Sequence, residues 1–406
     1  MSFYRSIFSA LIQLVFFSLC QLAYTSLPAQ GRMPVKVQYQ NGLNLEFPDS
    51  DLNTKTKLSF AGRIHYDLTL TDQSTEINNL VGEAGNSQQF RRIFLMHSGE
   101  LFYGKLNYKI QFDFTGGEIG FRDIYIEPKL FKAGSFEGFI RVGQFKDPFR
   151  FENMLSGNNL SLLERSYIAN FAPLRNTGLM YHMNSADQKF SFQFAFLENS
   201  TDAGKDISPD DGHNLTSRVT YLPLHEDDLT LHLGAAISIR DRGKEGKYTL
   251  KAKPPVSTLP NYLSFAINDV EDVRLVNFEA VLIRRQLMIM SEVLIGSVNA
   301  AANHSADAYY GQVSYLINKH SYHTYKNSLL GIKDHISEKG AWEIALRFAA
   351  ANFKDESPVA PAVSDLTFGT IYYFNEQLRV MLNLSHIHLR SAGNAKALSI
   401  RLQTTF

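Results

Sequence analysis

Hydrophobic and polar residues alternate along most of the chain, in segments of about ten residues separated by polar stretches. The alternation is clearest in KLNYKIQFDFT (105–115), QKFSFQFAF (188–196) and the terminal KALSIRLQTTF (396–406). A period of two residues is that of an extended strand, whose successive side chains point to opposite faces. The pattern therefore predicts β-strands that each have one apolar and one polar face.

The polar faces of these strands indicate what the apolar faces contact. Alternation alone also occurs in soluble sandwiches and barrels, in which packed side chains fill the interior. Here the polar faces carry Lys, Arg, Asp, Asn and Gln, which need water. An apolar outside and a polar inside are typical of transmembrane β-barrels, which must close because lipid cannot satisfy an open sheet edge. Beyond residue 30, no apolar run reaches the length of about 18 residues that a spanning helix needs.

The strand count between residues 58 and 406 is about sixteen, an even number as bacterial barrels prefer. We therefore expect an all-β fold, a transmembrane antiparallel β-barrel that forms one domain over 58–406. Two segments are less regular: 339–353 contains helix-friendly alanines but is favoured as a strand, and 270–298 could be one long hairpin. The expected strand centres lie near Arg63, Phe94, Ile110, Tyr125, Arg141, Met180, Phe194, Val219, Leu233, Phe278, Met290, Val313, Ile344, Thr370, Met381 and Ile400.

The first 29 residues have the features of a signal peptide. Arg5 supplies positive charge, an apolar stretch follows at 7–20, and LPA at 27–29 is a plausible cleavage site. We expect an exported protein whose mature chain begins near Gln30, with residues 30–57 as a periplasmic lead-in that holds one short strand. A retained membrane anchor is the alternative, although the apolar run is short and interrupted by polar residues.

The single cysteine, Cys20, lies inside the predicted signal peptide. Lipid attachment at Cys20 is a further alternative, disfavoured because bulky Leu19 precedes it. The mature chain then has no thiol, so packing and hydrogen bonds alone must stabilise it, and thiolate chemistry is excluded.

Composition and motifs narrow the function classes. The 40 basic and 40 acidic side chains balance, which argues against a nucleic-acid-binding protein, and 30 Phe and 19 Tyr argue against disorder. The sequence lacks HExxH, GxSxG, P-loop, dinucleotide-binding and EF-hand motifs, so we expect no enzyme, cofactor or metal. A barrel hydrolase with Ser and His partners that meet only in space stays open, and His386 and His388 are weak candidates for a metal pair.

A long connection at 146–176 carries more apolar residues than a solvated loop needs. We expect it to pack against the inner wall of the barrel and to narrow the lumen. Its apolar residues include Phe149, Met154, Leu160, Leu162, Leu163 and Phe171.

Eight fragments, in their order and spacing, resemble the phosphate-selective porins O and P. They are LSFAGRIHYDL (58–68), QFRRIFLMHSGELFYGKLNYKIQFDF (89–114), DIYIEP (123–128), VGQFKDPFRFE (142–152), LLERSYIANFAPLRNTG (162–178), LPLHEDD (222–228), GAWEIALRF (340–348) and LSIRLQTTF (398–406). The resemblance implies a sixteen-stranded homotrimeric porin of the bacterial outer membrane, surrounded by outer-membrane lipid, with its third extracellular loop folded into the lumen. It implies diffusion of small anions such as phosphate through an arginine-lined constriction.

The resemblance also places constriction residues. The first family arginine falls on Arg63 in GRIHYD, the paired arginines on Arg91 and Arg92 in FRRIF, the constriction acid on Asp123, and the loop arginine on Arg165 in LERS. Arginine suits an anion site because its planar donors stay charged and replace part of the anion's hydration shell.

Strand parity agrees in part with these assignments. Arg63, like His65 and Asp67, lies on the polar face of the first strand and is expected in the lumen. Arg91 and Arg92 are adjacent, so a regular strand would send one of them outward at about 2–4 kcal/mol at the bilayer midplane. A β-bulge that turns both inward, or a place near the rim or a subunit contact, would avoid this cost, and the resemblance favours the bulge.

Asp123 is expected on one face with Phe121, Tyr125 and Glu127, where it would pair with the arginines across the lumen and weaken their field. The tyrosine that follows the paired arginines in phosphate-selective porins is Phe94 in this chain. The plainer alternative is that these charges form an ordinary hydrated wall or inter-strand salt bridges.

Further basic residues are candidates for extending an anion path: Lys105, Lys109 and Lys146, with Arg150, Arg240 and Arg401. Each of them is equally well explained as a solvated charge. A weakly selective general pore, or a porin for carboxylates, sugars or other small hydrophilic solutes, is therefore the main functional alternative.

Overall fold

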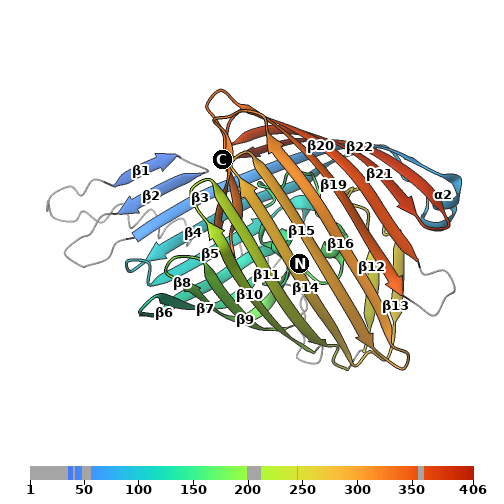
Figure 1. The fold of residues 1–406 in the computed structure, drawn as a ribbon, viewed down its shortest axis with the longest axis horizontal. Coiled ribbons are helices and arrows are strands. Elements are labelled where there is room, and N and C mark those ends of the chain that lie inside the picture. Colours follow the sequence, from blue (N-terminus) through green and yellow to red (C-terminus); the bar gives the residue numbers. More distant parts are fainter. Residues whose placement is uncertain (1–34, 40–41, 48–55, 199–211, 245, 355–360) are drawn as a thin grey trace, which may run out of the picture.

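The computed structural model describes residues 35–406 except 40–41, 48–55, 199–211, 245 and 355–360, so the predicted signal peptide lies outside the described residues. Sixteen antiparallel strands form a closed barrel (Figure 1). The barrel strands are β3 (Thr56–Gln73), β4 (Ser87–Leu101), β5 (Leu106–Asp113), β6 (Gly120–Ala133), β7 (Phe136–Lys146), β8 (Arg175–Ser185), β9 (Phe190–Glu198), β10 (His213–His225), β11 (Leu229–Asp241), β14 (Asp272–Arg284), β15 (Leu287–Asn299), β16 (His304–Leu316), β19 (Ala341–Lys354), β20 (Ala362–Tyr373), β21 (Leu378–Leu389) and β22 (Gly393–Thr405).

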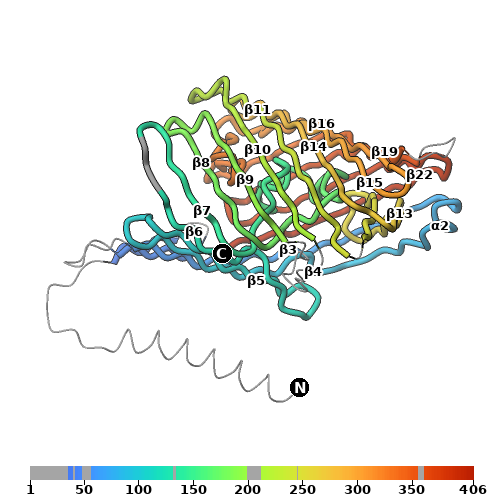
Figure 2. Tube along the Cα trace, turned by 90° about the horizontal axis from the view of Figure 1, so that it is seen from below, coloured from blue at the N-terminus to red at the C-terminus, as the bar shows by residue number. Residues whose placement is uncertain are grey.

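Every expected strand centre falls inside one of these strands, so the predicted β-barrel is confirmed. The alanine-rich segment is strand β19, and the segment 270–298 is the β14–β15 hairpin. The last strand closes the barrel on the first, with Ile400 opposite Leu68. Figure 2 shows the strands as diagonal traces around this closed wall.

The lead-in differs from the expectation, because it contains two short strands, β1 (Lys36–Tyr39) and β2 (Leu43–Phe47). Strand β22 ends opposite Arg63, so the first residues of β3 extend beyond their barrel neighbour. Strand β2 pairs with this extension, with Leu45 opposite Leu58. The pairing covers a strand edge that would otherwise stay open.

The connections contain smaller elements that the hydrophobic pattern did not predict. Helix α2 follows β3 and is capped by Ser74, whose side chain accepts a hydrogen bond from the amide of Ile77. Among the described residues, no helix is long and apolar enough to cross a bilayer. The elements are α2 (Thr75–Val81), η1 (Thr115–Gly117), α3 (Phe151–Met154), η2 (Tyr167–Asn170), β12 (Tyr248–Ala252), β13 (Leu263–Ile267), β17 (Tyr322–Asn327) and β18 (Gly331–His335).

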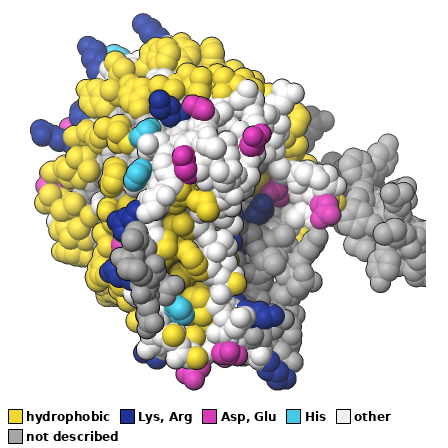
Figure 3. All heavy atoms as spheres, turned by 90° about the vertical axis from the view of Figure 1, so that its right-hand side faces the viewer, with side chains coloured by type: hydrophobic (Ala, Val, Ile, Leu, Met, Phe, Trp, Pro, Cys, Tyr) yellow, Lys and Arg dark blue, Asp and Glu magenta, His cyan; other side chains and the backbone are white. Residues whose placement is uncertain are grey.

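Large apolar side chains cover the outer wall. In β19, Leu346 is 43% exposed, whereas its neighbour Arg347 points inward and is 1% exposed. Hydrophobic side chains form broad continuous areas on the upper left of the molecule in Figure 3. This arrangement matches the lipid-facing band of an outer-membrane barrel.

We expect Leu346→Arg to destabilise the folded barrel in lipid by about 2–4 kcal/mol, because the charge enters hydrocarbon. The check is urea-dependent folding into lipid vesicles. Leu80→Arg is the matched control, since Leu80 is 66% exposed on α2, outside the barrel wall. Equal losses for the two variants would contradict the lipid-facing assignment of β19.

Arginines on the inner face are largely neutralised by nearby carboxylates. Four of them are almost fully buried, and each forms an ion pair. The pairs are Arg218 with Glu279, Arg240 with Asp147, Arg347 with Glu152 and Arg401 with Asp67.

Candidate functional site

A β-bulge brings Arg91 and Arg92 to the same side of the wall. In the pairing of β3 with β4, Arg92 lies opposite His65 and Phe90 lies opposite Tyr66, so Arg91 is the extra residue. Both guanidinium groups line one cavity inside the barrel. The predicted bulge is therefore confirmed, and neither arginine has to face lipid.

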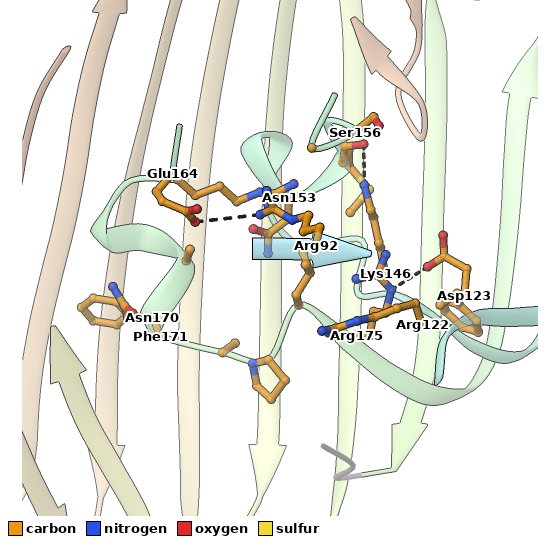
Figure 4. Close-up of a pocket in the computed structure, with 18 of the residues that line it drawn as sticks. Arg92, Arg122, Asp123, Lys146, Asn153, Ser156, Glu164, Asn170, Phe171 and Arg175 are labelled. Atoms are coloured by element: carbon orange, nitrogen blue, oxygen red, sulfur yellow. Dashed lines mark hydrogen bonds and ion pairs between the residues drawn. The ribbon is translucent and has the colours of Figure 1, made fainter. Parts of the chain in front are cut away.

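The cavity has a volume of about 770 Å³ and is strongly cationic. Arg92, Lys146 and Arg175 point into it, with Glu164 and Asp123 at its sides (Figure 4). Among the described lining residues, Asp123 and Glu164 are the carboxylates, against twelve basic residues. These are Arg63, Arg91, Arg92, Lys109, Arg122, Arg141, Lys146, Arg165, Arg175, Arg242, Lys251 and Lys253.

Several of these cations form close ion pairs, which reduce the positive field that they contribute. Asp123 serves two of them, because its carboxylate lies 2.6 Å from Lys109 Nζ and 2.6 Å from Arg175 Nε. The other close pairs are Arg91 with Glu164 at 2.9 Å, Arg122 with Asp113 at 2.5 Å and Arg141 with Glu127 at 2.5 Å.

Five lining cations form no ion pair with any described carboxylate: Arg63, Lys146, Arg165, Lys251 and Lys253. Lys146 Nζ donates to the carbonyls of Met154 and Leu155, and Arg165 donates to the carbonyls of Glu152 and Leu155. Carbonyl dipoles hold these side chains in place without cancelling their charge. The cavity thus keeps an excess of positive charge at fixed positions.

Glu164 lies in the connection 147–174 and faces three guanidinium groups. Burial opposes its ionisation, but the charges of Arg91, Arg92 and Arg401 outweigh burial and hold the pKa of Glu164 well below its usual range. Glu164 is therefore ionised at neutral pH. It weakens the field of Arg91 and Arg92, whereas Arg63 and Arg165 form no ion pair with a described carboxylate.

All five residues carried over from the family resemblance meet at this cavity. Arg63, Arg91, Arg92, Asp123 and Arg165 line it together, as do Lys109 and Lys146. We expected Asp123 to pair with the arginines across the lumen. Its carboxylate instead accepts hydrogen bonds from Lys109 and Arg175.

Lys105 does not line the cavity, which corrects its assignment to a basic path. It is exposed in the turn that joins β4 to β5, where Phe102, Tyr103 and Gly104 all have positive φ. The turn therefore takes Lys105 out of the strand that alternation had extended back to residue 105. Among the additional basic residues, Arg150, Arg240 and Arg401 are buried in hydrogen bonds or ion pairs and also lie outside the lining.

A second bulge places Phe121 and Asp123 on opposite faces of β6. The pairing of β5 with β6 shifts between Ile110 opposite Ile124 and Phe112 opposite Phe121. Phe121 is exposed on the outer wall while Asp123 and Glu127 are buried inside and Tyr125 lines the cavity, so the expected shared face is wrong for Phe121 alone. The same bulge lets Arg122 line the cavity beside Asp123. Sequence reasoning missed Arg122 because alternation has no signal for an inserted residue.

Part of the cavity wall is apolar. The guanidinium carbon of Arg63 lies 5.1 Å from the ring centre of Phe94, and that of Arg141 lies 4.1 Å from the ring centre of Tyr125. Leu329 and Leu330, between β17 and β18, also line the cavity. The hydrated polar inner face that alternation predicted is therefore incomplete in this region.

The connection 147–174 is held by lumen-facing residues of the barrel wall. Glu292 of β15 accepts hydrogen bonds from the amides of Phe151 and Glu152, both at 2.8 Å. Arg347 of β19 donates to the carbonyl of Glu164 at 2.9 Å, and Arg401 of β22 donates to that of Leu163 at 2.7 Å. Arg165 and Glu164 reach the cavity from this connection.

A closed sixteen-stranded barrel with an apolar outer wall and a charged internal cavity defines an outer-membrane porin. The chain belongs to the phosphate-selective porin O and P family, whose model matches residues 59–406. Membership confirms the resemblance and places the protein in the bacterial outer membrane. It also points to a channel and not to an enzyme.

Solved structures show the same fold at low sequence identity. An anion-selective porin from Comamonas acidovorans is 12% identical, with a TM-score of 0.57 over 86% of this chain and 100% of that chain. OmpF of Salmonella typhi, in complex with daunomycin, is 12% identical, with a TM-score of 0.56 over 91% and 100%. The trimer form of OmpT from Vibrio cholerae is 10% identical, with a TM-score of 0.55 over 86% and 99%. No curated protein matches the chain.

Proposed function

We propose that the protein is an anion-selective porin that lets small anions such as phosphate diffuse passively through the cationic cavity. The observation that carries the proposal is the group of five lining cations without an ion pair to a described carboxylate. The uncompensated charge lowers the energy of an anion in the passage and raises that of a cation. The formal net charge of the chain is zero, so the preference comes from where the charges sit.

The connection 147–174 acts in this proposal as the inward-folded third extracellular loop that forms the constriction. Support comes from its hydrogen bonds to Glu292, Arg347 and Arg401, three residues of the inner wall. The connection brings Arg165 to the cavity that Arg63 and Arg92 of the wall also line. Asp123 and Glu164 limit how tightly the site binds an anion, since conduction requires release as well as attraction.

The assembly in this proposal is a homotrimer, inserted after a signal peptide at 1–29 is removed, with 30–57 as the periplasmic lead-in. The family supports the trimer, and OmpT of Vibrio cholerae, which shares the fold, has a trimer form.

A planar-bilayer recording of the purified protein tests the function. At 8 Å in water each charge contributes about 0.5 kcal/mol, so five uncompensated charges, partly screened by salt, give an anion-to-cation permeability ratio on the order of ten. The reversal potential in a potassium chloride gradient measures this ratio. Millimolar phosphate is expected to reduce the chloride current. A ratio near one without phosphate block would instead identify a weakly selective porin.

A further inference from the structure

We propose that the preferred solute is an organic anion with an apolar body, held between the unpaired cations and a hydrophobic surface of the same cavity. The inference rests on the anion-porin function and names its solute class. The hydrophobic surface, called the apolar strip below, consists of Tyr125, Leu329 and Leu330.

The inner wall beneath the apolar strip is unusual for a hydrated pore. Strands β7, β8 and β9 turn Phe145, Met180, Ala195 and Leu197 inward, and all four are 0% exposed. Tyr125 and Leu329 pack against this cluster. Polar side chains would be expected on the lumen side of three adjacent porin strands. The strip therefore rests on a continuous apolar base.

Leu330 adds an exposed apolar group that faces the cavity. Leu330 lies in the turn between β17 and β18 and is 62% exposed. The turn is fixed, because Asn327 Oδ1 accepts hydrogen bonds from the amides of Leu329 and Leu330, and Arg218 donates to the carbonyl of Ser328 at 2.8 Å. A leucine held in water at this place is available to a solute, and covering it contributes favourable free energy.

The turn is also docked on the connection 147–174. The side-chain amide of Asn159 donates a hydrogen bond to the carbonyl of Ile332 at 2.6 Å. Gly331 has φ of +68°, and a Cβ there would lie 2.6 Å from Leu155 Cδ2, so the two segments touch closely. The leucines thus keep a defined position relative to Arg165 and Lys146, which bond to carbonyls of the same connection.

Cations lie directly beside the apolar strip. Lys146, which has no ion pair with a described carboxylate, follows Phe145 at the end of β7, and its Nζ donates to the carbonyl of Leu155, the residue that the turn with Leu329 and Leu330 approaches at Gly331. Inorganic phosphate is charged on all sides and gains nothing from an apolar wall. A carboxylate with a hydrocarbon body can bind the cations at one end and cover the strip with the other.

The test compares two probes, acetate and hexanoate, as inhibitors of chloride current in planar bilayers at neutral pH. We expect hexanoate to inhibit at about tenfold lower concentration than acetate, because covering about two of its four additional CH₂ groups corresponds to a factor of that size. Leu330→Ser is expected to raise the inhibitory concentration of hexanoate about threefold to tenfold and to leave acetate and phosphate unchanged. Leu80→Ser, at a similarly exposed leucine on α2, serves as the control.

The possible results separate the solute class from the function. Equal inhibition by hexanoate and acetate, or a hexanoate response unchanged by Leu330→Ser, would overturn the organic-anion proposal. The chloride reversal potential of the same channels would then still report whether the pore selects anions. Channels without anion selectivity would overturn the proposed function, and the solute class with it.

Discussion

Arg63→Glu lowers the anion-to-cation permeability ratio by about tenfold or more. Arg63 lines the cavity without an ion pair to a described carboxylate, and its guanidinium contacts Met96 Sδ at 3.4 Å and Ser156 Oγ at 3.5 Å. The substitution changes the local charge by two units while breaking few contacts. At 8 Å two units amount to about 1 kcal/mol in water and about 4 kcal/mol at an effective dielectric constant of 20, and 1.4 kcal/mol corresponds to tenfold.

The reversal potential in a salt gradient checks this result. Lys105→Glu is the matched control, because it makes the same change in charge at an exposed turn outside the cavity lining. Arg63→Gln removes the charge without reversing it and is expected to fall between the wild type and Arg63→Glu. If Lys105→Glu shifted the reversal potential as much as Arg63→Glu, selectivity would arise from the overall field of the barrel and not from the cavity.

The strands could be predicted from the sequence because one physical constraint acts along their whole length. Lipid outside and water inside force alternation, so even the alanine-rich segment of β19 is recognisable from Trp342, Ile344, Leu346 and Phe348. The bulge at Arg91 was also predictable, because two adjacent arginines cannot both follow a regular strand without one facing lipid.

The details of the cavity could not be predicted in the same way. The bulge that turns Arg122 inward leaves no trace in alternation, and Arg175 meets Asp123 only through folding, since 52 positions separate them. The turn with Leu329 and Leu330 lies in a polar connection whose place inside the barrel depends on contacts with Arg218 and Asn159. Such contacts join distant parts of the chain, which a local period cannot reveal.

Glu292→Ala is expected to loosen the connection 147–174 and to lower the free energy of unfolding by about 3–5 kcal/mol. Glu292 is buried and accepts four hydrogen bonds, from the amides of Phe151 and Glu152, from Asn277 and from the Tyr310 hydroxyl. Alanine leaves the two backbone amides of α3 without this acceptor in a buried place. Since the same connection carries Arg165 to the cavity, its motion is also expected to appear as larger fluctuations of the single-channel current.

Denaturant unfolding and single-channel noise measure the two effects of Glu292→Ala separately. Glu100→Ala is the control, because Glu100 is about half exposed in a surface pair with Lys57 and should cost little. Glu292→Gln keeps one acceptor oxygen. We expect it to recover part of the stability and to bring the single-channel noise most of the way back to that of the wild type. If Glu292→Ala lost stability without any change in noise or conductance, the connection would only stabilise the barrel and would not form the constriction of the solute passage.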